Sequence, residues 1–167
     1  MQQNNHYCQF HILFTTQNEI QCSFIPYTSS QNPSQNNSQI IQLENNSKNK
    51  YPITIQFDNN DIYFCKEENT QTISFMKDLV QNPKEWKQYS ISYKTKEYLF
   101  VAETLLALLV QQFKQKIEKE WIIKETYFQI ETENCFLIER ITNALECCGL
   151  KNVIFQPLTY DYSNQID

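Results

Sequence analysis

Glycine is almost absent from this sequence of 167 residues, which contains only one, Gly149. Glycine-rich turns let backbone N–H groups come close to a phosphate, and a single glycine cannot build them. The chain therefore lacks the usual backbone means of holding a nucleotide. Arginine is equally scarce, since Arg140 is the only one in the chain.

Positive charge is also in deficit, because 14 Lys and Arg residues stand against 19 Asp and Glu, for a formal net charge of -5. Proteins that bind nucleic acid usually present a basic patch to the phosphates. Lys114, Lys116 and Lys119 do not form one, because they stand beside Glu118 and Glu120 as on a solvent-facing helix surface. Direct contact with nucleic acid is therefore not expected.

Long apolar runs are missing too, and the longest, residues 105–110, is far too short to span a bilayer. No secretory signal precedes the first of the six cysteines, so we expect reduced thiols in an intracellular protein, cytoplasmic or nuclear. The adjacent Cys147 and Cys148 are interpreted as packing thiols at a helix end rather than as a redox or metal pair.

Histidine is limited to His6 and His11, which flank Cys8. This spacing matches no common zinc pattern, and strand alternation would place His11 on the face opposite the other two. We therefore predict no metal site and no cofactor.

Aromatic residues are plentiful, with 11 Phe, 10 Tyr and 2 Trp, so the chain can bury a sizeable core. A chain of this length normally forms one domain. We expect a single domain over residues 1–167 that contains a polar loop at 28–39, where Ser, Asn, Gln and Pro predominate.

Hydrophobic periodicity predicts several hairpins followed by the order β-α-β-α-β. Such an order implies an α/β fold with a mixed sheet and helices packed on it. We expect the two long helices to pack on a sheet that contains the strands around Tyr89, Ile123 and Val153. The predicted strands cover 6–14, 19–27, 40–43, 51–57, 62–65, 89–93, 98–101, 122–130 and 153–155, and the predicted helices cover 72–80, 102–119 and 134–148.

Four segments together resemble one known family, in the same order. Residues 40–66 (IIQLENNSKNKYPITIQFDNNDIYFCK) look like its strand, polar loop and paired strands leading to a lysine, and 72–80 (TISFMKDLV) like its "NTV-D-KRLIG" helix. Residues 89–120 look like its hairpin and "EEI-A-VL-K-K--AE" helix, and 148–162 (CGLKNVIFQPLTYDY) like "AGL-V-RIINEPTAAA-AY". The chain thus resembles the N-terminal ATPase lobe of the 70-kDa heat-shock chaperones, a ribonuclease-H-like, actin-like ATPase subdomain.

The chain departs from this family at the residues that handle the nucleotide. The family's D-x-G-T-T phosphate turn falls on residues 14–18, which keep Thr15 and Thr16 but neither the Asp nor the Gly. Its catalytic lysine falls at Lys66, and the carboxylate of its "NEP" motif falls on Gln156. The resemblance therefore implies a vestigial nucleotide-binding set of Thr15, Thr16 and Lys66, without catalysis.

The resulting expectation is a non-catalytic pseudo-ATPase module that acts as a binding or structural subunit of a larger protein assembly. The family's domain continues past the position of Asp167, so we expect a protein partner to cover this side, with contacts at Val153, Phe155, Tyr160 and Tyr162. Two alternatives stay open: a nucleotide-binding, chaperone-like ATPase fragment completed by a partner chain, and a small OB-type nucleic-acid-binding subunit.

Overall fold

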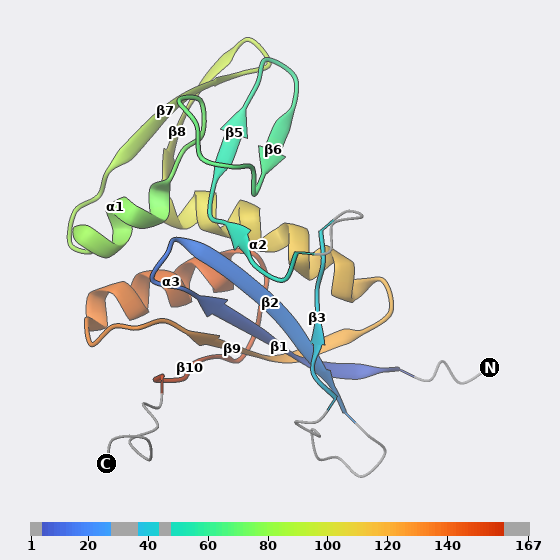
Figure 1. The fold of residues 1–167 in the computed structure, drawn as a ribbon. Coiled ribbons are helices and arrows are strands. Elements are labelled where there is room, and N and C mark those ends of the chain that lie inside the picture. Colours follow the sequence, from blue (N-terminus) through green and yellow to red (C-terminus); the bar gives the residue numbers. More distant parts are fainter. Residues whose placement is uncertain (1–4, 28–36, 44–47, 159–167) are drawn as a thin grey trace.

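The central feature of the computed structural model, which describes residues 5–27, 37–43 and 48–158, is a six-stranded mixed sheet (Figure 1). Its order is β10-β9-β1-β2-β3, and β4 pairs with β2 beside β3. Strands β1, β9 and β10 are parallel to one another, whereas β2 is antiparallel to β1, β3 and β4. The predicted α/β class is confirmed at this level. The six strands are β1 (Tyr7–Phe14), β2 (Glu19–Pro26), β3 (Gln39–Ile40), β4 (Tyr51–Pro52), β9 (Ile122–Gln129) and β10 (Val153–Phe155).

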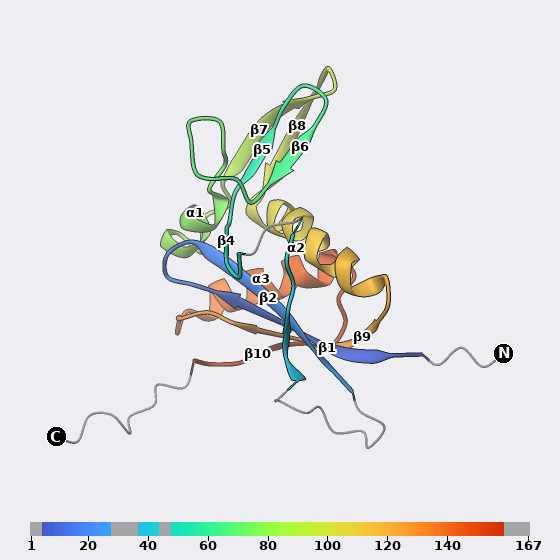
Figure 2. The ribbon, with the colours of Figure 1, turned by 45° about the vertical axis from the view of Figure 1, so that its right-hand side comes forward.

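Two helices, α2 (Ala102–Glu118) and α3 (Cys135–Cys147), lie on one face of this sheet (Figures 1 and 2). Side chains alternate across a strand, so every second residue of β1 faces the helices, and these residues are buried. The apolar residues that recur at helical spacing along α2 are also buried, which agrees with the expectation that this helix packs on a sheet. The residues that meet in this core include Cys8, Phe10, Ile12 and Phe14 from β1 and Leu105, Leu109, Phe113 and Ile117 from α2.

Both ends of α3 follow from its sequence. The side chain of Asn134 accepts hydrogen bonds from the backbone N–H groups of Phe136 and Leu137 and so caps the first turn. At the other end Gly149 has a φ of +83°, and the N–H of Leu150 donates to the carbonyl of Leu145 at 3.3 Å. Glycine favours such a left-handed stop at a helix end because it has no Cβ atom.

Two hairpins form a separate lobe above α2 (Figures 1 and 2). The first pairs β5 (Ile55–Phe57) with β6 (Ile62–Phe64), and the second pairs β7 (Gln88–Tyr93) with β8 (Lys96–Val101). The Phe57 ring stacks on Phe100 with centroids 5.6 Å apart and joins the two hairpins. We call these four strands the hairpin lobe.

The hairpin lobe corrects two expectations. The strand around Tyr89 does not belong to the main sheet, because β7 pairs with β8 in a sheet of two strands. The single strand expected over 51–57 is divided into β4, which pairs with β2, and β5, which pairs with β6. The alternation of apolar and polar residues indicates that a segment is extended and half buried, but it does not indicate which strand pairs with it.

The short helix α1 (Phe75–Gln81) begins later than the expected residue 72, because Ile73 forms a β-bridge with Ile55. Its buried side chains include Phe75 and Leu79, which are four residues apart and share one side of the helix, whereas Val80 is 48% exposed. The loop expected at 28–39 falls mostly outside the described residues, and β3 begins at residue 39.

Several turns adopt left-handed backbone conformations without glycine. Asn18 in the β1–β2 turn has a φ of 59°, and Asn152 before β10 has a φ of 51°. Cys65 after β6 and both Lys94 and Thr95 in the β7–β8 turn lie in the same region. Asn tolerates this conformation better than most residues, whereas a β-branched Thr rarely adopts it.

A buried ion pair joins the two long helices. Arg140 of α3 makes a two-point contact with Glu103 of α2, in which Nη2 and Oε2 are 2.9 Å apart. The same guanidinium donates to the carbonyls of Pro83 and Glu85 and lies 4.8 Å from the centre of the Trp86 ring. Burial acts to raise the pKa of the Glu103 carboxyl, but the hydrogen bonds and charge of Arg140 outweigh burial and lower this pKa overall.

Replacing Arg140 with alanine should therefore lower the free energy of unfolding by about 3–5 kcal/mol, because an unpaired carboxylate stays buried. Urea unfolding measures the change. The control is Lys77→Ala, which removes the exposed Lys77–Glu68 pair and should cost at most about 1 kcal/mol. Equal losses for the two variants would contradict this role of Arg140.

The same pair should make stability depend on pH. Because the pKa of Glu103 is lower in the folded than in the unfolded chain, its stabilising contribution is complete above the usual value of 4.5. This contribution is lost as the pH falls through the folded value. The difference in unfolding free energy between the natural chain and Arg140→Ala should therefore shrink below a pH of 4.5.

Candidate functional site

A hollow of about 260 Å³ lies where the β1–β2 turn meets α1 and the end of β9. We call it the turn hollow. Thr15 and Thr16, two of the three expected nucleotide-binding residues, line it together with Asn18. The hydroxyl of Thr15 accepts a hydrogen bond from the backbone N–H of Glu19 at 3.2 Å. This hydrogen bond helps to close the turn.

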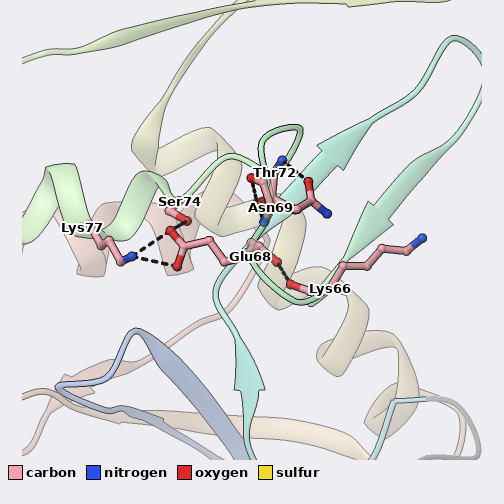
Figure 3. A network of polar contacts seen from close by, with 7 residues as sticks. Lys66, Glu68, Asn69, Thr72, Ser74 and Lys77 are labelled. Carbon is pink, nitrogen blue, oxygen red and sulfur yellow. Dashed lines mark hydrogen bonds and ion pairs between the residues drawn. The ribbon is translucent and has the colours of Figure 1, made fainter.

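The charges beside the turn hollow do not favour a phosphate. Lys77 is the only cationic side chain among the described residues that line the hollow, and Glu131 adds a carboxylate. The Lys77 ammonium lies 2.8 Å from both carboxylate oxygens of Glu68, and the Ser74 hydroxyl donates to the same carboxylate (Figure 3). The hydrogen bond from Lys77, followed by that from Ser74, lowers the pKa of Glu68. The positive charge of Lys77 is thus already paired with the carboxylate of Glu68.

Lys66, the third expected nucleotide-binding residue, lies elsewhere. Its side chain extends away from the Glu68–Lys77 pair (Figure 3), and its ammonium is 3.8 Å from the centre of the Tyr63 ring. The Thr54 hydroxyl donates to the carbonyl of Lys66 at 2.6 Å and holds the backbone there. Lys66 lines a different cleft, of about 500 Å³, between β6 and α2. The structure therefore places Thr15 and Thr16 in one hollow and Lys66 in another.

The strand β10, which contains the expected partner contacts Val153 and Phe155, is the last strand on its side of the sheet in the described part of the chain. Phe155 packs against Phe128 with ring centroids 5.4 Å apart, whereas Ile154 is 42% exposed. The expected contacts at Tyr160 and Tyr162 lie outside the described residues.

The backbone of β10 has hydrogen-bonding capacity on its outer side. The carbonyl of Asn152 accepts from Thr126, and the N–H of Gln156 donates to Phe128. Because a strand in a parallel pair directs alternate residues to its neighbour, the backbone groups of Val153 and Phe155 point away from β9. These are the groups that a further strand would pair with.

Sequence reasoning missed a polar network on the sheet face opposite the helices. One carboxylate oxygen of Glu125 accepts hydrogen bonds from Gln9, Tyr27 and Tyr127 at 2.9–3.0 Å. These hydrogen bonds, with the largest effect from that of Tyr127, lower the pKa of Glu125, and burial raises the pKa of Tyr127 to about 12. A carboxylate so well supplied with donors stabilises the pairing of three strands rather than serving as a base.

Alternation on each strand could have placed these residues on the outer face, but the parallel register of β1 and β9 cannot be read from the sequence. On that face His11 stacks on Tyr127 with ring centroids 5.0 Å apart, while Cys8 is buried on the core face, so the two lie on opposite faces as predicted. Burial lowers the pKa of His11 and raises that of the Cys8 thiol to about 12. No group of three metal-binding side chains converges among the described residues.

Comparison with known proteins adds no relative. No protein-family model matches the chain, and no curated protein matches it. In the described ranges, none of the helices has the length and apolarity needed to cross a bilayer. The resemblance to a chaperone ATPase lobe therefore stays a prediction from the sequence.

Thiol labelling should separate the cysteines by their surroundings. Cys135 and Cys147 are exposed and should react first with a disulfide reagent at neutral pH, whereas the buried Cys8 and Cys22 should react only on unfolding. Burial raises the pKa of both core thiols, so little thiolate is available there. A Cys135→Ser/Cys147→Ser variant should lose the fast phase, and fast labelling of Cys8 in the folded chain would contradict the packing described above.

Proposed function

We propose that this chain is a non-catalytic binding module, a pseudo-ATPase with the architecture of an actin-like lobe, that serves as a subunit of a protein assembly. The observation that carries the proposal is the outer edge of β10, which no strand of the described chain covers. The backbone groups of Val153 and Phe155 point outward there, and the side chain of Ile154 is exposed. The order of hairpins followed by β-α-β-α-β supports the architectural part of the proposal.

An open edge strand favours a protein partner because it offers unpaired N–H and C=O groups in a regular row. A partner strand can satisfy these groups, and side-chain contacts then provide specificity. Val153 and Phe155 face the core side of β10 and hold it in place, while Ile154 presents an apolar side chain on the other face. We therefore assign the edge to the addition of an extended partner segment.

Lack of catalysis is supported by the turn hollow. Electrostatic catalysis of phosphoryl transfer needs several groups arranged around the phosphates, including cations and backbone donors. The turn hollow offers a carboxylate at Glu131, a lysine already paired with Glu68, and no glycine in the turn. Lys66 lines a different cleft and adds no charge to the lining of this hollow.

Magnesium ATP should accordingly show no micromolar binding in isothermal titration calorimetry, and the chain should not hydrolyse it. Thr16→Ala tests the competing nucleotide-binding function, because Thr16 is an exposed residue of the turn hollow. If the natural chain binds magnesium ATP with micromolar affinity and Thr16→Ala weakens this binding, the proposal that the chain binds no nucleotide is wrong. The nucleotide-binding alternative is then supported.

Substitution of Ile154 tests the edge directly. A lysine at this position should oppose the addition of a strand, and Val153→Pro should remove an outward N–H without touching the bonds to β9. Ile122→Lys is the matched control, because Ile122 is 44% exposed at the start of the interior strand β9. Quantitative mass spectrometry of complexes recovered with the tagged chain measures the effect.

Both edge variants should reduce the recovery of specific partners by on the order of tenfold, which corresponds to the loss of a few favourable backbone contacts. The Ile122→Lys control should recover them at the natural level. If Ile154→Lys and Val153→Pro both retain every complex, and circular dichroism shows that both variants fold, the β10 edge is not the site of partner binding.

A further inference from the structure

A second surface, on residues that the β10 edge does not use, carries its own chemistry. The cleft of about 500 Å³ between β6 and the end of α2 has four lysines among its lining residues and no carboxylate among the described residues that line it. We call it the lysine cleft. Its polar lining consists of Lys48, Lys66, Lys116, Lys119, Gln112, Gln115 and the tyrosines Tyr51 and Tyr63.

Three separate parts of the chain bring these lysines together. Lys116 and Lys119 follow Gln112 and Gln115 at helical spacing, so all four side chains lie on one side of α2 at its end. Lys66 directly follows Cys65, whose backbone is in the left-handed region, and Lys48 lies in the segment before β4. The sequence suggested that the helix lysines were solvated beside glutamates, but the fold joins two of them to Lys48 and Lys66.

Little in the described chain neutralises this charge. Lys48 is paired with Glu67 at 3.0 Å, but both side chains are largely exposed. Within the described ranges, Lys66, Lys116 and Lys119 make no ion pair with a carboxylate. Like charges gathered in a concave site raise the local positive potential, although the chain carries a net charge of -5. An anionic ligand is therefore the natural complement of the cleft.

We propose that the lysine cleft binds an acidic segment of a protein, a short run of aspartate or glutamate side chains. Its volume admits only a few side chains, and the glutamine amides can donate hydrogen bonds to carboxylates. A long nucleic acid fits less well, because its phosphates would extend past the cleft onto a protein surface that is acidic overall. The apolar stems of the lysines and the Tyr63 ring provide contact area beside the charges.

Fluorescence anisotropy with a labelled oligoglutamate peptide tests this proposal on the full chain. The double variant Lys116→Glu/Lys119→Glu should weaken binding by on the order of tenfold or more, and raised salt should weaken binding to the natural chain. Lys94→Glu/Lys96→Glu is the matched control, because it changes the net charge equally at two exposed positions, one in the β7–β8 turn and one at the start of β8. An oligoglutamine peptide of the same length should not bind.

The remaining outcomes decide against the proposal. It fails if the natural chain does not bind oligoglutamate, or if the control variant weakens binding as much as the cleft variant does. It also fails if labelled oligothymidylate binds more tightly than oligoglutamate and depends on the cleft lysines in the same way. In that case the cleft is a nucleic-acid-binding surface. Should Lys116→Glu/Lys119→Glu misfold, Lys116→Gln/Lys119→Gln provides the same test with a smaller expected loss. Because no β10 residue is involved, a negative result leaves the proposed edge function intact.

Discussion

The parallel pairing of β1 with β9 is the contact on which the rest of this structure depends, because it joins the opening hairpin to the two helical crossovers. On the core side it sets Phe14 near Phe128, with ring centroids 6.5 Å apart. On the opposite side it brings Glu125 within hydrogen-bonding distance of Gln9. Non-local pairing of this kind closes a long loop of chain, so the core and the outer polar network reinforce a contact that is entropically expensive to form.

The elements themselves could largely be predicted from the sequence, because local chemistry determines them. The cap at Asn134, the left-handed stop at Gly149 and the apolar stripe of α2 all act within a few residues. The failures concern neighbours rather than elements. The residues around Tyr89 do not indicate that this strand pairs only with β8. The residues at 51–57 likewise do not indicate that the segment passes from one sheet to another.

The candidate sites were harder to predict from the sequence than the fold, for the same reason. The lysines of the cleft are separated by long stretches of sequence, and two of them stand beside glutamates that face elsewhere. The resemblance to a chaperone lobe grouped Thr15, Thr16 and Lys66, whereas the structure assigns them to two hollows. By contrast, the resemblance directed attention to the side near Val153, because the family's domain continues past this strand, and β10 is the last strand on that side of the sheet in the described part of the chain.

The scarcity of glycine has a consequence for the energy landscape of this chain. Cys65, Lys94 and Thr95 occupy left-handed conformations that cost roughly 1–2 kcal/mol each for residues with a side chain. A domain's whole net stability is only about 5–15 kcal/mol, so these turns are points of local frustration held in place by the packing around them. Two of them lie at the tip of the hairpin lobe, far from the main core (Figure 1). Thermal fluctuations should therefore release this tip first, and the hairpin lobe would act as the weakest cooperative unit of the fold.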